Sequence, residues 1–124
     1  MKEMTPHQKT RFRSAHSTAA VSNLLDALYL PRTGVRVGSM FGSRAYFFGR
    51  RLFACIRKQG VCLRVGHKRA GRAIAAGVAT PFRPHGRTMR GWVEFWPTAP
   101  TAEARDLLLR ALAYTRTIQK EDAR

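Results

Sequence analysis

Three glycines at short spacing among arginines make the stretch VGSMFGSRAYFFGRR, residues 37–51, a candidate phosphate-binding loop. A Walker loop requires G-x-x-x-x-G-K-[ST], whose lysine contacts the phosphates, and a dinucleotide loop requires G-x-G-x-x-G at the start of a helix. Gly38 and Gly42 are one residue too close for the first pattern, and Ser43-Arg44 stands where it needs Lys-Ser/Thr. The glycine spacing fails the second pattern as well. We therefore interpret Gly38 and Gly42 as turn residues between strands, and we predict no bound cofactor.

The two cysteines are candidates for redox or metal chemistry. Cys55 and Cys62 have six residues between them, and four further residues separate Cys62 from His67. Structural zinc sites prefer two to four residues between cysteine ligands, so the spacing predicts no metal site. A hairpin would place the two thiols opposite or diagonal to each other, on a basic face that favours thiolates. Ordinary reduced thiols are the simpler interpretation, and a small thiol-redox or anion-binding module is a weaker functional alternative.

Acid–base catalysis finds little support in the chain. Such catalysis needs a carboxylate, or a histidine that a carboxylate orients. No carboxylate occurs between Asp26 and Glu94, the segment that contains His67 and His85. Glu94 would lie on a strand, where an ion pair with Arg90 or with an arginine of a neighbouring strand is its ordinary role. We predict a non-enzymatic protein with no catalytic residues.

Positive charge is the strongest signal in the sequence. The chain has 23 lysines and arginines against 7 acidic residues, and the acid-free segment holds 14 of the basic ones. An arginine-rich coding bias would explain arginine in place of lysine, but it would not explain the missing acids. A protein this basic attracts polyanions, and the arginine fork suits phosphate and carboxylate oxygens. The candidate nucleic-acid- or anion-binding residues are Arg50, Arg51, Arg57, Lys58, Arg64, Lys68, Arg69, Arg72 and Arg90.

Two tryptophans accompany this charge. Trp92 and Trp96 would share one face of a strand with Arg90, so they are candidates for stacking on bases of a single strand. Burial, or a contact in a homodimer, is the alternative use of the two rings.

Local patterns predict the elements that position these residues. Apolar residues recur at helical spacing over three ranges, which predicts helices at 17–30, 67–77 and 101–120. Period-two patterns predict about five strands, within 35–41, 44–48, the two arms of a hairpin over 51–65, and 88–97. Links this short cannot be parallel crossovers, so the sheet should be mainly antiparallel. The hairpin should turn at Gln59-Gly60, with Leu52 on its apolar face and Phe53 on the opposite, basic face.

These elements form one α+β domain over residues 17–120, with helices packed against the sheet. Residues 1–16 lack hydrophobic periodicity and are predicted to be a disordered basic tail, and 121–124 a short tail. No apolar run reaches the length of about 18 residues that a membrane span needs, and the N-terminus lacks a secretory signal. Two cysteines without an export signal indicate a cytoplasmic protein.

A set of residues along the chain forms a recognisable pattern. It comprises the Met40-Phe41-Gly42 triplet, Gly49, Phe53-Ala54, the hairpin, Pro81-Phe82, Met89, an aromatic residue at Trp92, and Pro97. In these features, residues 17–118 resemble the N-terminal domain of the TfoX/Sxy competence-regulator family, here without a C-terminal domain. The resemblance implies an antiparallel sheet flanked by helices, in a bacterial cytoplasmic protein linked to regulation of DNA-uptake genes. It carries over no catalytic residues.

Together these observations predict a non-enzymatic regulatory or adaptor domain of the TfoX N-terminal type. Its basic surface would bind an acidic protein or a nucleic-acid backbone. The alternative is a sequence-tolerant nucleic-acid-binding protein that uses the basic residues between Arg57 and Arg72.

Overall fold

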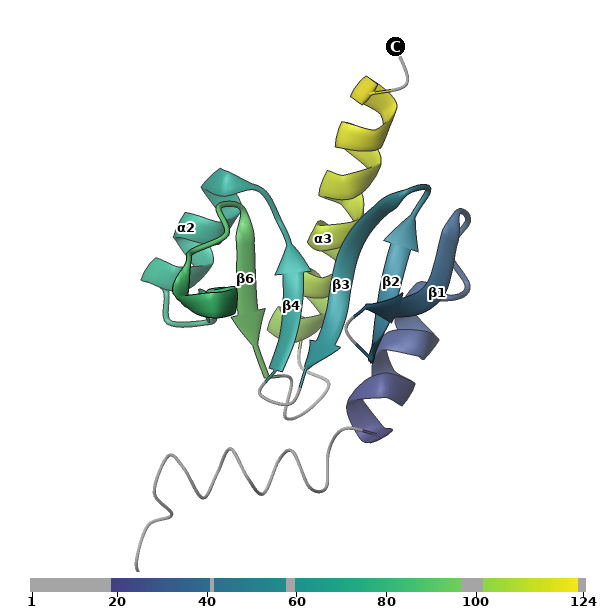
Figure 1. The fold of residues 1–124 in the computed structure, drawn as a ribbon, viewed down its shortest axis with the longest axis horizontal. Helices are drawn as coiled ribbons and strands as arrows, with labels where there is room; N and C mark the ends of the chain where they lie inside the picture. Colours follow the sequence, from purple (N-terminus) through teal and green to yellow (C-terminus); the bar gives the residue numbers. More distant parts are fainter. Residues whose placement is uncertain (1–18, 41, 58–59, 97–101, 123–124) are drawn as a thin grey trace, which may run out of the picture.

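A computed structural model describes residues 19–40, 42–57, 60–96 and 102–122. Six strands form one antiparallel sheet in the order β1-β2-β3-β4-β6-β5 (Figure 1). The strands are β1 (Val35–Met40), β2 (Ser43–Phe48), β3 (Arg51–Arg57), β4 (Gly60–Arg64), β5 (Thr80–Pro81) and β6 (Trp92–Phe95). The helices are an N-terminal helix over residues 19–29, α2 (His67–Ala75) and α3 (Ala102–Asp122). The predicted α+β class and antiparallel sheet are confirmed.

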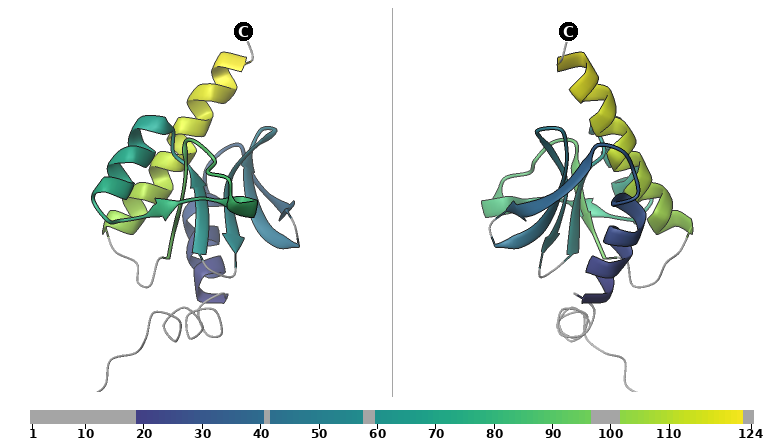
Figure 2. Two further views of the ribbon diagram at one scale, coloured as in Figure 1. Left: turned by 60° about the vertical axis from the view of Figure 1, so that its left-hand side comes forward. Right: turned by 90° about the vertical axis from the view of Figure 1, so that its right-hand side faces the viewer.

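The helices cover one side of the sheet, which we call the inner face. Figure 2 shows them together on that side, and shows the connection between β5 and β6 on the opposite side, which we call the outer face. The short 3-10 helix η1 (Pro84–Gly86) belongs to this connection. Among the described residues, the outer face thus carries no α-helix, so side chains of the strands and of this connection can face outward there.

The inner core forms where the apolar stripes of two helices meet the sheet. In α3, the stripe predicted from the sequence is confirmed, since Leu107, Leu108 and Ala111 are buried. Tyr29 of the N-terminal helix donates a hydrogen bond from its hydroxyl to the carbonyl oxygen of Leu108, at 2.8 Å. Its ring also contacts Phe53 edge-on, with centroids 4.8 Å apart. These contacts join both long helices to the sheet.

A β-bulge changes which hairpin residues face the core. The register between β2 and β3 shifts between Tyr46 and Phe47, and Phe53 is the unpaired residue that results. An extra residue in one strand reverses the alternation beyond it. Phe53 therefore lies in the inner core, whereas Leu52 packs in a separate cluster on the outer face. The prediction from strict alternation, which placed these two residues the other way round, is wrong.

Several predicted boundaries change for physical reasons. Gly42 has a positive φ of 76° and allows the β1–β2 turn, but Gly38 lies within β1 opposite Ala45, so it is not a turn residue. A two-residue strand, β5, lies in the predicted 80–87 loop, because so short a strand has no periodicity to detect. The predicted strand over 88–97 shrinks to β6, and α3 continues through the first two residues of the predicted tail at 121–124.

Asp26 ties the N-terminal helix to β2. Its carboxylate accepts hydrogen bonds from Arg44, at 3.0 Å from Nε and 2.9 Å from Nη2, and from the Tyr46 hydroxyl at 2.6 Å. Burial tends to raise the pKa of Asp26, but the bonds from Tyr46 and Arg44 outweigh it, and the pKa lies below its usual value of 3.8. The folded state therefore gains stability above the unfolded pKa, and loses it as the pH falls through the folded pKa.

Asp26→Asn should remove this pH-dependent contribution. We expect the variant to unfold with about 1–2 kcal/mol less stability at pH 7, a value reduced because Arg44 is partly exposed. The gap to the wild type should narrow as the pH falls below about 4 and through the lowered folded pKa, because the carboxylate then becomes protonated in the folded state as well. Urea unfolding at a series of pH values measures the gap, and a gap independent of pH would contradict this account.

Candidate polyanion-binding face

A small apolar cluster covers part of the outer face. Leu52 from β3, Cys62 from β4, Trp92 from β6 and Phe82 form it, and Trp92 is only 6% exposed. Phe82 begins a segment over residues 82–91, which we call the strap. The amide of Met89 donates to the carbonyl oxygen of Phe82 at 2.9 Å, which closes the strap into a loop. The cluster is therefore a second, minor core that anchors the strap to the sheet.

Arginine side chains lie over the aromatic rings of this face. The guanidinium of Arg64 lies 5.0 Å from the ring centre of Trp92, and that of Arg57 lies 5.4 Å from the ring centre of Phe82. The Nε of Arg64 also donates to the carbonyl oxygen of Leu52, at 3.1 Å. Such cation–π contacts hold a guanidinium in place while they leave N–H groups for other acceptors. Burial lowers the pKa of Arg64, but an arginine remains protonated in proteins.

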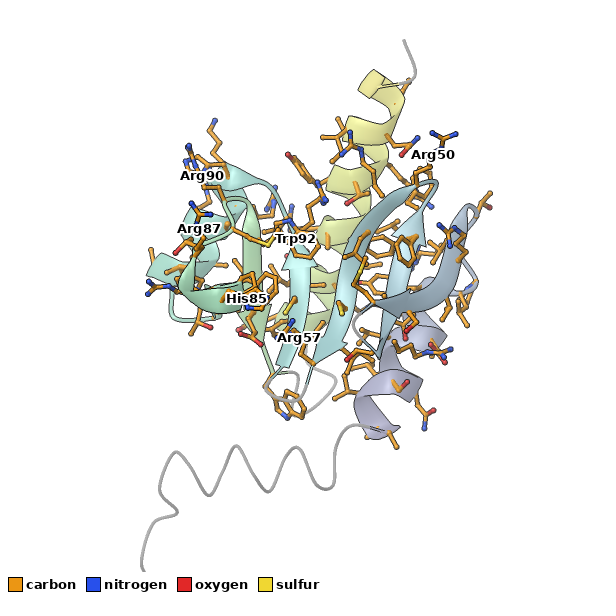
Figure 3. The ribbon with its side chains drawn as sticks, in the orientation of Figure 1. Arg50, Arg57, His85, Arg87, Arg90 and Trp92 are labelled. Atoms are coloured by element: carbon orange, nitrogen blue, oxygen red, sulfur yellow. The ribbon has the colours of Figure 1, made fainter. Side chains whose placement is uncertain are left out.

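The strap adds exposed positive charge beside these two arginines. Arg83, Arg87 and Arg90 are all exposed, as is His85 at the tip. Figure 3 shows Arg87 and Arg90 to one side of Trp92, and Arg57 below it. Glu94 is the only acidic residue in the described strands and the strap. We call Arg57, Arg64, Arg83, Arg87 and Arg90 the arginine rim.

The basic residues predicted from the sequence are divided among several places. Only Arg57, Arg64 and Arg90 belong to the arginine rim. Arg50 lies at the β2–β3 turn, well away from them in Figure 3, and Arg51 begins β3. Lys68, Arg69 and Arg72 belong to α2, where they line a cavity of about 210 Å³ with residues 65–67 and Tyr114. Lys58 lies outside the described residues.

Sequence reasoning missed Arg83 and Arg87. They stand in the segment TPFRPHGRTMRG, residues 80–91, which contains three arginines and no acidic residue. The positive charge of this segment could therefore have been recognised from the sequence. What the sequence did not reveal is the anchoring of Phe82 beside Trp92, with ring centres 5.9 Å apart, which places the strap on the outer face.

The two tryptophans do not form a shared stacking platform, and for Trp92 the alternative of burial is the one observed. Trp92 faces outward, but the cluster buries it and Arg64 lies over its ring. Trp96 follows the end of β6 and packs against the inner core. Because β6 ends at Phe95, strand alternation no longer applies to Trp96, so there is no reason to expect its ring on the same face as Trp92.

The thiols of Cys55 and Cys62 are free and buried, and the two residues face each other in the β3–β4 register. Burial raises the pKa of both, and the charge of Glu94 raises that of Cys62 further. The predicted preference for thiolates is therefore wrong, because desolvation outweighs the nearby Arg57. Among the described residues, no group of three or more histidine, cysteine or acidic side chains is arranged to hold a metal ion.

Glu94 of β6 lies directly opposite Cys62 of β4. Its Oε2 accepts a hydrogen bond from the Cys62 thiol at 3.9 Å. Burial raises the pKa of Glu94, while the charge of Arg57 and the thiol bond lower it. Among the described strands and the strap, Glu94 is the one carboxylate, and it already interacts within the protein with Cys62 and with Arg57 of the arginine rim.

Comparison of the chain with protein-family models, curated proteins and solved structures finds no match. The resemblance to the TfoX/Sxy N-terminal domain stays a prediction. No helix in the described part of the chain is long and apolar enough to cross a membrane. We therefore infer the function from the residues and charges of the outer face alone.

Proposed function

We propose that the protein is a non-enzymatic domain that binds the phosphate backbone of nucleic acids through its outer face, with little sequence preference. The observation that supports this most is the arginine rim: five guanidinium groups on one face, with one carboxylate that is already hydrogen-bonded. Phosphate contacts of this kind supply most of the affinity of non-specific nucleic-acid binding. The resemblance to a competence-regulator domain supports a regulatory or adaptor role for such binding.

The two anchored arginines would contribute in a particular way. A free arginine loses side-chain entropy when it binds a phosphate, which weakens binding. Arg57 and Arg64 already lie over Phe82 and Trp92, so less of that entropy remains to be lost. The exposed arginines of the strap would add contacts along the backbone. Sequence preference should be weak because, among the described residues, this face has no α-helix that could enter a major groove.

A panel of polyanions tests this proposal. At low salt, the protein should shift a fluorescent DNA duplex and a single-stranded oligonucleotide irrespective of their sequence, because both present phosphates. A polyglutamate of matched charge should bind more weakly, because it lacks phosphate oxygens that fit the arginine fork. If neither nucleic acid binds at low salt, the proposal is wrong. Tighter binding of polyglutamate would replace it with an acidic protein partner.

A further inference from the structure

Cys55 and Cys62 occupy the centre of a cross-strand row of side chains on the outer face. The strand registers place Ala45 opposite Cys55, Cys55 opposite Cys62, and Cys62 opposite Glu94. Directly opposed residues in a sheet point to the same side of it. Both thiols therefore lie on the face that carries the arginine rim, and they are neighbours in space.

The strand register places the two cysteines within the Cα separation that a disulfide requires. Directly opposed residues of antiparallel strands have Cα atoms about 4.5–5.5 Å apart. A disulfide requires a Cα separation of about 4.4–6.8 Å. The bond would therefore need side-chain rotation without a change of register. Cys55 is 5% exposed and Cys62 is fully buried, so the nearest thiol for each is the other cysteine.

We propose that Cys55 and Cys62 form a reversible cross-strand disulfide, with small-molecule disulfides of the glutathione type as the oxidant. In the first step, one cysteine sulfur, after loss of its proton, attacks the oxidant and forms a mixed disulfide, and one small thiolate leaves. In the second step, the other cysteine sulfur attacks the mixed disulfide and releases the second small thiolate. Two S–H bonds are lost, one S–S bond forms, and the oxidant is reduced to two thiols.

The effect of the disulfide on nucleic-acid binding rests on the proposed function, and it depends on a change in the hydrogen-bond partner of Glu94. In the reduced protein, the Cys62 thiol donates a hydrogen bond to Glu94 Oε2. A disulfide has no S–H group, so oxidation removes this donor. Arg57 is the cation whose charge acts on Glu94 in the reduced protein. After oxidation, Arg57 takes the place of the lost donor and turns away from a bound phosphate, so oxidation weakens binding of nucleic acid.

The disulfide itself is tested on the folded protein with oxidised glutathione as the probe. Because burial keeps both thiols protonated, the incubation uses a pH of about 8.5, where more thiolate forms. Wild type should lose both free thiols and show an intact mass lower by two hydrogen atoms, reversed by dithiothreitol. Cys55→Ser and Cys62→Ser should show no such mass change. Two thiols that stay free in the folded protein, but react after unfolding in urea, would overturn the proposal. A stable glutathione adduct on wild type would overturn it equally.

The coupling to binding has a separate test. With a duplex oligonucleotide as the probe, oxidised wild type should bind with a salt slope about 0.9 shallower than reduced wild type, which is the loss of one phosphate contact. In Glu94→Gln, oxidation should leave the slope unchanged, because no carboxylate remains to attract Arg57. Equal slopes for reduced and oxidised wild type would overturn the coupling but not the disulfide. If no form of the protein binds the oligonucleotide, the proposed function fails and the thiol result still stands.

Discussion

Replacing the three strap arginines by glutamine should weaken binding of a DNA duplex at low salt by on the order of 10²–10³-fold, which is roughly tenfold for each lost phosphate contact. The variant is Arg83→Gln, Arg87→Gln and Arg90→Gln. All three side chains are exposed, so their loss should leave the fold intact. Glutamine keeps much of the side-chain length and removes the charge without adding repulsion. Fluorescence anisotropy with a labelled duplex measures the change.

A matched variant separates the position of the charge from its amount. Arg50→Gln, Arg105→Gln and Lys120→Gln removes the same net charge from exposed residues outside the arginine rim. We expect this control to lose less than about threefold in affinity, through the weaker long-range attraction alone. Equal losses in the two triple variants would show that binding depends on net charge and not on the strap.

Phe53→Ala should cause the largest loss of stability, about 3–5 kcal/mol. The ring is fully buried in the inner core and packs edge-on against Tyr29, so its removal leaves a cavity that links the sheet and the N-terminal helix. Leu52→Ala is the matched control, because Leu52 is only partly buried in the outer cluster. We expect it to cost about 1–2 kcal/mol.

Urea unfolding of both variants decides which residue faces the core. Strict alternation through β3 would make Leu52 the core residue and reverse the order of the two losses. A larger loss for Leu52→Ala than for Phe53→Ala would therefore contradict the bulge between Tyr46 and Phe47.

The elements that the sequence predicted well have strong local signals. The stripe of α3 is long and periodic, and α2, predicted over 67–77, ends at Ala75, two residues before Gly77. There, the amide of Gly77 donates to the carbonyl oxygen of Ile74 and that of Val78 to Ala73, both at 3.0 Å. Gly77 has a positive φ of 75°, which glycine adopts without strain. Such features depend on residues close in the chain, so a sequence pattern can reveal them.

The features that the sequence did not predict depend on contacts between distant residues. The bulge exchanges Phe53 and Leu52 because β3 must match β2, and no pattern within β3 indicates this. The strap lies on the outer face because Phe82 packs with Trp92, ten positions later. The basic zone from Arg57 to Arg72 is continuous in sequence. Its second half, Lys68 to Arg72, lies on α2 and beside a cavity, away from the outer face. Charge composition therefore predicted a class of partner, and only the fold could divide the charges among surfaces.

The salt dependence of duplex binding, compared between the wild type and the two triple glutamine variants, tests the central claim most directly. Each phosphate contact contributes about −0.9 to the slope of log K against log salt concentration. The outer-face account predicts that the strap variant has a slope about 2.7 shallower than wild type, whereas the control variant keeps the wild-type slope. A strap variant with the wild-type slope, or a control variant that loses as much slope, would contradict the claim that the outer face binds the backbone.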